Sequence, residues 1–163
     1  MVNQVMDKMV EYYRGDPKRI QHFLKVYTLA HRIASGENVS SEELFIIDIA
    51  SLVHDIGIRV SEEKYNSSAG KYQELEGPAE AEKLLGALGI NEAVIDRVCY
   101  IIAHHHTYTA IDSMDLQILI EADFLVNLYE DNVSKTAVLS AGKNIFKTPT
   151  GIKYLTNMFD IYL

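Results

Sequence analysis

The chain of 163 residues has room for one domain with a single core, and 48% hydrophobic with 23% charged residues is typical of a folded globular protein. A formal net charge of −8 argues against nucleic acid as a partner, because neutralising a phosphate backbone requires a basic surface. The single cysteine excludes an intramolecular disulfide, and no apolar run is long enough to span a membrane, so we expect a cytoplasmic protein without a membrane partner.

Apolar residues recur at intervals of three and four along most of the chain, which predicts a series of amphipathic helices. Capping residues mark where several of them begin. The expected helices are 17–36 after Asp16, 41–56 after the Ser40–Glu43 capping box, 78–88 opened by Pro78, a helix from 92 to the histidines at 104–106, 116–130 after an Asp112–Asp115 box, 134–146, and 149–162 opened by Pro149. No run alternates as a strand does, so we predict an all-α, single-domain helical bundle.

Residues 58–77 are the main interruption in this pattern. The segment is polar and contains Gly and Ser, which predicts a long surface loop with at most one helical turn. Because a loop of that length in a compact domain is more often functional than idle, it is a candidate lid or specificity element.

Three polar positions interrupt the apolar faces of the expected helices. His22 heads an apolar stripe on its helix, and His54 with Asp55 lies inside the apolar run ASLVHDIGIRV. Asp123 lies on the apolar stripe of QILIEADFLVNLY, whereas we expect its neighbour Glu121 to be solvated. An unpaired carboxylate in such surroundings would be strongly destabilising.

Each of these residues alone also has a structural interpretation. A buried histidine can donate to a backbone carbonyl, and the carboxylates can pair with Arg32, Arg97 or a lysine. Together, however, three helices supply two imidazoles and two carboxylates, which suit a borderline divalent cation. The combination therefore favours a metal centre over separate structural pairs.

The ordered set of these segments resembles the HD-domain superfamily of metal-dependent phosphohydrolases, specifically its small HDIG-type branch. The blocks RIQHFLKVYTLAHRIA, ASLVHDIG, VCYIIAHHH and ILIEADFLVN carry the similarity, which covers about residues 19–130. The resemblance implies an all-helical fold, on which we expect the helices at 134–162 to pack. It also implies metal ligands at His22, His54, Asp55 and Asp123.

The resemblance further implies one divalent metal ion, either Mn, Fe, Co, Ni or Zn. His31 stands where the family has no ligand, and no histidine occurs from 56 to 103 to serve the second metal that some members hold. We therefore expect a mononuclear site. Gln73, Glu74 and Glu76 occupy the region where a further histidine would stand, so a second metal held with the help of carboxylates is the alternative. The neighbouring residues Ile58 and Arg59 fit neither the (p)ppGpp-hydrolase branch nor the small 5′-nucleotidase branch.

The implied reaction is attack of a metal-activated water on a phosphoester. Asp55 is the candidate to orient or deprotonate that water. His104 and His105 are candidates to hold a phosphate oxygen or to protonate the leaving group, whereas His106 is expected to be exposed. Candidate cations for the substrate phosphate are Arg19, Lys64 and Lys71.

The expected function is thus a phosphomonoesterase or phosphodiesterase acting on a small, nucleotide-like phosphorylated molecule. One alternative is a catalytically silent metal-binding or nucleotide-binding regulatory module of the same fold. A metal oxygenase is a third reading, against which the missing middle histidine counts. Ten tyrosines and the apolar C-terminal MFDIYL would suit a homo-oligomer.

Overall fold

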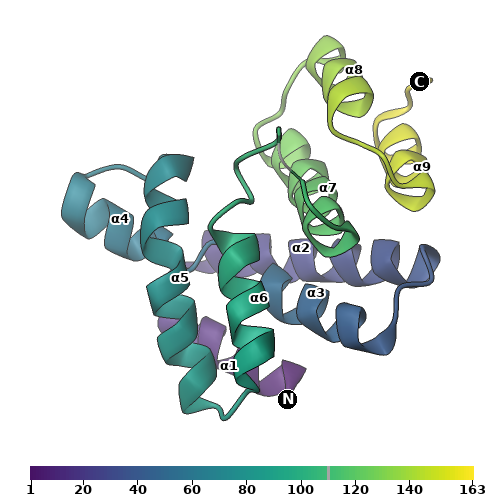
Figure 1. The fold of residues 1–163 in the computed structure, drawn as a ribbon. Coiled ribbons are helices and arrows are strands. Elements are labelled where there is room, and N and C mark those ends of the chain that lie inside the picture. Colours follow the sequence, from purple (N-terminus) through teal and green to yellow (C-terminus); the bar gives the residue numbers. More distant parts are fainter. Residues whose placement is uncertain (110) are drawn as a thin grey trace.

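The computed structural model describes residues 1–109 and 111–163, and within them every regular element is an α-helix (Figure 1). The helices are α1 Val2–Tyr12, α2 Pro17–Gly36, α3 Ser41–Val53, α4 Ile58–Tyr65, α5 Gly70–Ala87, α6 Glu92–Ile102, α7 Met114–Glu130, α8 Lys135–Asn144 and α9 Pro149–Phe159. The all-α prediction is confirmed for this part of the chain. None of these helices combines the length and the hydrophobicity needed to cross a membrane.

Helices α2, α3 and α7 form the centre of the bundle. α2 packs against both of the others, and α3 also contacts α7 and α6. Fully buried aliphatic side chains of these helices and of α6 contribute to the core, including Val26, Ile33, Leu52, Ile101 and Leu119. The α5–α6 pair, with α4 at its corner, lies on one side of this centre, and α8 and α9 lie on the other (Figure 1).

Side-chain caps begin several helices where the sequence predicts them. Asp16 accepts a hydrogen bond of 3.1 Å from the amide of Arg19, with Pro17 as the first residue of α2. Ser40 and Glu43 form the reciprocal capping box at the start of α3. These caps satisfy amides that have no partner within the helix, so the helix starts are set by local sequence.

The structure corrects the prediction for residues 58–77. They form α4 and the first half of α5, so only residues 66–69 connect the two helices. Pro78 lies inside α5 rather than opening a helix. α3 ends at Val53 instead of continuing to residue 56, which places residues 54–57 in a turn.

Close contact between backbones explains why these residues are helical despite their polarity. A Cβ atom at Gly57 would lie 2.7 Å from the amide nitrogen of Gly77 and 2.8 Å from the carbonyl oxygen of Gln73. The turn after α3 therefore packs directly onto the backbone of α5. This tertiary contact stabilises a segment whose apolar residues are too few to predict a helix.

The expected Asp112–Asp115 cap is also wrong. Arg97 binds both carboxylates, at 2.7 Å from Asp112 Oδ2 and 2.5 Å from Asp115 Oδ1. Ser113 precedes α7 and makes no side-chain cap. Arg97 therefore pairs with these two carboxylates and not with Asp123, so it is not the structural partner of that buried acid.

Glu121 is buried, not solvated as the sequence suggested. Its side chain lies between α7 and the connection from α8 to α9. Glu121 accepts hydrogen bonds from the side chain of Gln117, the amide of Lys147, and both the amide and the hydroxyl of Thr148. The carboxylate is therefore satisfied by donors of the fold and is separate from the histidine cluster described next.

Candidate metal centre

His54 and Asp55 lie in the turn immediately after α3. The His54 side chain is fully buried, and its Nδ1 is 2.9 Å from the carbonyl oxygen of Ser51, to which it donates. That bond leaves the lone pair of Nε2 directed away from the helix, 3.4 Å from Asp55 Oδ2. The end of α3 thus presents an imidazole and a carboxylate at the same point.

His22 approaches this point from the first turns of α2. Its Nδ1 lies 3.0 Å from Glu130 Oε2 at the end of α7. The other ring nitrogen, Nε2, lies 3.2 Å from Asp123 Oδ1 and 3.4 Å from Asp55 Oδ2. Three separate helices therefore bring together His22, the His54–Asp55 pair and Asp123, the four residues for which the resemblance implies metal binding.

Several of the converging atoms are buried and have no hydrogen-bond partner among the described residues. They are the Nε2 atoms of His22, His54 and His105, and Oδ1 of Asp123. Buried polar atoms are normally hydrogen-bonded, so a group of such atoms facing one another needs something between them. Imidazole nitrogens and carboxylate oxygens in this arrangement fit a borderline divalent cation.

The electrostatics of the cluster favour ionised carboxylates. Burial opposes ionisation of Asp55 and Asp123, but the facing histidines outweigh it and hold the pKa of both carboxyls well below the ordinary value. Burial likewise disfavours protonated His54, yet the two carboxylates hold its pKa well above the ordinary value. The two carboxylates therefore attract positive charge to the cluster. Either a metal ion or protons on the histidines can supply that charge.

A second group of ligand atoms adjoins the first. Asp55, His105 and His106 offer nitrogen and oxygen atoms within 4.8 Å of one another. Asp55 faces both groups, since Oδ2 is directed at His22 and His54 while Oδ1 lies 3.6 Å from His105 Nε2. A second set of potential metal ligands therefore adjoins the expected single-metal site. The spacing of the histidines in the sequence did not indicate this second set.

Comparison with known proteins shows the family to which the chain belongs. The family model described as HD domain matches residues 19–137, most of the chain. The chain belongs to the HD-domain family. HD domains bind divalent metals, and the His and Asp groups of this HD domain are suited to hold one. The sequence-based assignment to this family is confirmed.

A crystal structure described as a predicted HD superfamily hydrolase, from an uncultured Thermotogales bacterium, has the same fold. The match has a TM-score of 0.69 and 26% sequence identity, and it covers 97% of this chain and 84% of that one. It therefore includes α8 and α9 beyond the family model. No curated protein matches this chain.

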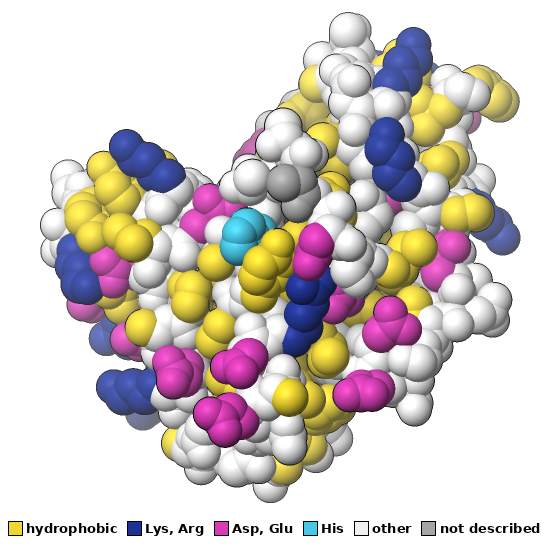
Figure 2. All heavy atoms as spheres, viewed as in Figure 1, with side chains coloured by type: hydrophobic (Ala, Val, Ile, Leu, Met, Phe, Trp, Pro, Cys, Tyr) yellow, Lys and Arg dark blue, Asp and Glu magenta, His cyan; other side chains and the backbone are white. Residues whose placement is uncertain are grey.

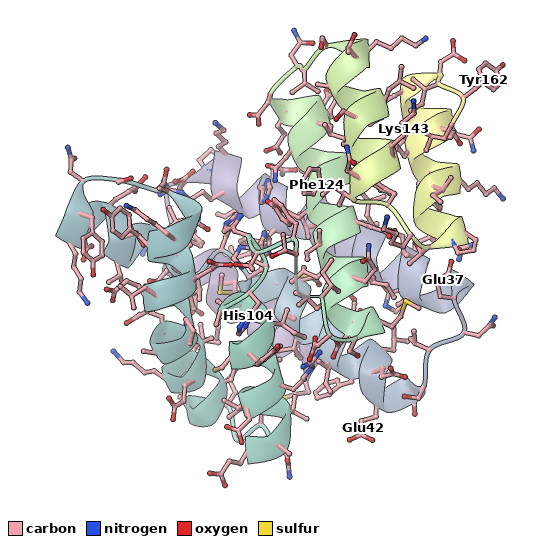
Figure 3. The ribbon with its side chains drawn as sticks, turned by 45° about the horizontal axis from the view of Figure 1, so that its top comes forward. Glu37, Glu42, His104, Phe124, Lys143 and Tyr162 are labelled. Atoms are coloured by element: carbon pink, nitrogen blue, oxygen red, sulfur yellow. The ribbon has the colours of Figure 1, made fainter. Side chains whose placement is uncertain are left out.

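The structure separates the three consecutive histidines of this HD domain. His104 lies at the C-terminal end of α6, where its ring stacks on Tyr100 and its Nδ1 donates to the Tyr100 carbonyl at 2.7 Å (Figure 3). It belongs to neither group of ligand atoms, so its expected catalytic role has no support from its position. His105 is buried in the cluster, and His106, expected to be exposed, lines the adjacent cavity instead.

Of the three expected phosphate-binding cations, only Arg19 lines that cavity of about 330 Å³. Even Arg19 is engaged by carboxylates, at 3.1 Å from Asp16 and 2.6 Å from Glu62. Lys64 pairs with Glu76, and Lys71 lies over the ring of Tyr72. The structure places both lysines on the α4–α5 corner, not in the lining of the cavity.

Several lining residues of the cavity were not among the expected site residues, and four of them bear on its chemistry. Lys18 is exposed at the start of α2 and has no ion-pair partner among the described residues. Gln73 Oε1 lies 3.3 Å from His106 Nε2, and Asn127 and Glu130 line the α7 side. No spacing pattern could identify them, because their relevance depends on where α5 and α7 meet α2.

Proposed function

We propose that this HD domain is a metal-dependent phosphohydrolase acting on a small phosphoester. The observation that carries the proposal is the convergence of unpartnered buried atoms from four segments, at α2, α7 and the ends of α3 and α6, beside an open cavity. The Thermotogales protein with the same fold is described as a predicted HD superfamily hydrolase, which supports hydrolysis as the class of reaction. A purely structural role would leave several buried polar atoms unsatisfied for no gain.

In this proposal His22, His54, Asp55 and Asp123 hold one divalent cation. Such a cation, when bound, lowers the pKa of a water and polarises a phosphoryl oxygen. Asp55 uses Oδ2 toward the histidines, which leaves Oδ1 to orient the attacking water as a hydrogen-bond acceptor. His106 lines the cavity beside Gln73, whereas His104 does not, so His106 is the histidine of this segment that would contact the substrate in the cavity.

The charges of the cavity support a substrate with a single phosphate. Five acidic residues line it, namely Asp16, Asp55, Asp123, Glu130 and Asp131, whereas its cations are Lys18 and Arg19. Because Arg19 is already paired with carboxylates, Lys18 is the cation available to a phosphate. A volume of about 330 Å³ is at the small end of ligand pockets, which favours a compact monophosphate.

Metal analysis of the purified protein tests the centre. We expect about one equivalent of a first-row divalent metal per chain, and nearly complete loss in the variant Asp55→Ala. Full metal content in that variant would refute the proposed ligands. Two equivalents would instead assign a second cation to the group of Asp55, His105 and His106.

A panel of nucleotides and other phosphoesters, assayed with Mn²⁺, Co²⁺ and Ni²⁺, tests turnover. We expect phosphate release from a monophosphate, with a lower kcat/KM in Lys18→Met than in wild type. A protein that binds metal but releases no phosphate from any compound would be the catalytically silent module of the same fold. The proposed enzyme would then be wrong although the metal centre is correct.

A further inference from the structure

A second cavity, of about 430 Å³, lies between α2 and α9. Its lining residues are Arg32, Thr150, Lys153, Tyr154, Asn157 and Met158. None of them lines the cavity of the histidine cluster. Arg32 is ten residues beyond His22 on the same helix, roughly 15 Å along its axis. The two cavities are thus at different ends of α2.

One face of α9 lines this cavity. Its five lining residues recur at intervals of three and four, the spacing that places side chains on the same side of a helix. The start of α9 is held closely against the end of α2, because a Cβ at Gly36 would clash with the Thr150 side chain. Two rigid helices therefore set the shape of the cavity.

The lining is cationic in an otherwise acidic protein. The chain carries 23 acidic residues and a formal net charge of −8, yet no Asp or Glu lines this cavity. Arg32 and Lys153 face it, together with two hydroxyls and an amide. Lys and Arg side chains lie over the α8–α9 part of the face seen in Figure 2. This composition is the reverse of the acid-rich cavity at the histidine cluster.

The polar side chains of this lining make no hydrogen bond or ion pair with any described residue. Arg19, Arg59 and Arg97, by contrast, each pair with a carboxylate. Glu37, at the end of α2 beside the start of α9, accepts a hydrogen bond of 2.8 Å from the amide of Thr150 instead (Figure 3). The donors around the cavity are therefore available to a ligand.

We propose that the cavity between α2 and α9 binds a small phosphate-bearing anion at a site separate from the metal centre. A guanidinium group binds two phosphate oxygens with its planar fork, and a lysine adds a point charge. The hydroxyls of Thr150 and Tyr154 and the amide of Asn157 supply further donors. Met158 and the ring of Tyr154 provide apolar surface for the rest of the molecule.

Titration of the ¹⁵N-labelled, metal-free protein with inorganic phosphate tests the site. We expect saturable changes in the NMR shifts of residues 150–158 and of the last turns of α2, with millimolar affinity. The double variant Arg32→Met/Lys153→Met should weaken this binding by about tenfold or more, because both charges that hold the anion are lost. Arg32→Lys should weaken phosphate binding less, since the positive charge stays and only the planar guanidinium group is lost.

The matched control is Arg14→Met/Lys143→Met, which removes the same two charges from exposed positions outside this cavity. It should bind phosphate as wild type does, and both double variants should keep the unfolding temperature of wild type. Equal weakening in the two double variants would show unspecific attraction and overturn the proposal. So would the absence of saturable shifts on α9, whatever phosphate does at the metal centre.

Discussion

Glu130 distinguishes His22 from the other histidines of the cluster. His54 and His105 donate from Nδ1 to backbone carbonyls of Ser51 and Ile102, which no substitution can remove. His22 depends on a side chain, the carboxylate of Glu130, which also lies 2.5 Å from Lys25 Nζ. Glu130 is therefore the residue that fixes which nitrogen of His22 carries the proton and which faces Asp55 and Asp123.

Replacing Glu130 by Leu should lower the affinity for Mn²⁺ by about 10- to 100-fold, because His22 loses the acceptor that orients its ring. Calorimetric titration of the metal-free protein measures this affinity. Glu82→Leu is the control, since Glu82 is exposed on α5 and makes no ion pair with a described residue. Equal affinity in both variants would show that Glu130 does not support His22.

His106 should have an unusual titration in the metal-free protein. Burial, together with the neighbouring His105, lowers the pKa of His106 to about 4. The folded state then binds fewer protons than the unfolded state between the ordinary histidine pKa and about 4, so the free energy of unfolding should fall as the pH drops through this window.

An NMR titration of the His106 ring should give a midpoint near 4, and His106→Gln should reduce the pH dependence of unfolding over the same range. His31→Gln provides the comparison, because His31 pairs with Asp48 outside the cluster. A midpoint at the ordinary value would mean that the ring is open to solvent.

At the scale of elements, the metal centre depends on how closely the turn after α3 approaches α5. Gly57 and Gly77 permit this contact, and Gln73 and His106 then meet across it. The same approach packs the start of α5 against the histidines, where a Cβ at Gly70 would lie 2.7 Å from the His106 ring. Glu74 completes the junction by accepting hydrogen bonds from the His106 amide and the Thr107 hydroxyl.

Gly57→Ala should destabilise the protein by about 1–3 kcal/mol, because the added methyl group meets backbone atoms that cannot move aside independently. Chemical denaturation measures the loss. Gly86→Ala on α5 has open space around its Cβ and should instead stabilise the helix by about 0.5 kcal/mol. An unchanged stability in Gly57→Ala would show that the turn after α3 does not pack directly onto the backbone of α5.

At the scale of the whole molecule, Glu121 connects α7, which carries Asp123, to the C-terminal pair of helices. Its carboxylate accepts from donors at residues 147 and 148, next to the cap of α9. A Cβ at Gly151 would overlap this carboxylate, so α9 begins directly against α7. Through this contact α8 and α9 are held against the HD core.

Glu121→Gln should lower the free energy of unfolding by about 2 kcal/mol, because the amide replaces an acceptor by a donor facing the Thr148 hydroxyl. Hydrogen exchange in α8 and α9 should increase more than in α3. Glu82→Gln should change neither quantity. Uniform loss of protection along the chain would indicate that Glu121 supports the whole fold rather than this junction.

Local sequence was sufficient to predict much of this molecule. The caps at Asp16 and Ser40, and the apolar spacing of α2 and α7, act within a few residues of the chain, so they can be recognised without tertiary contacts. The polar residues His22, His54 and Asp123 were notable for the same reason, since each is out of place on its own helix.

The sequence by itself determined the all-helical class and the family, and it singled out His22, His54, Asp55 and Asp123, which the structure brings together. Only the tertiary structure decided that 58–77 is largely helical, that Arg97 binds Asp112 and Asp115, and that His106 rather than His104 faces the cavity. The physical reason is the range of the interactions. Caps and periodicity act over one or two helical turns, whereas burial, ion pairs and cavity walls depend on residues brought together from distant parts of the chain.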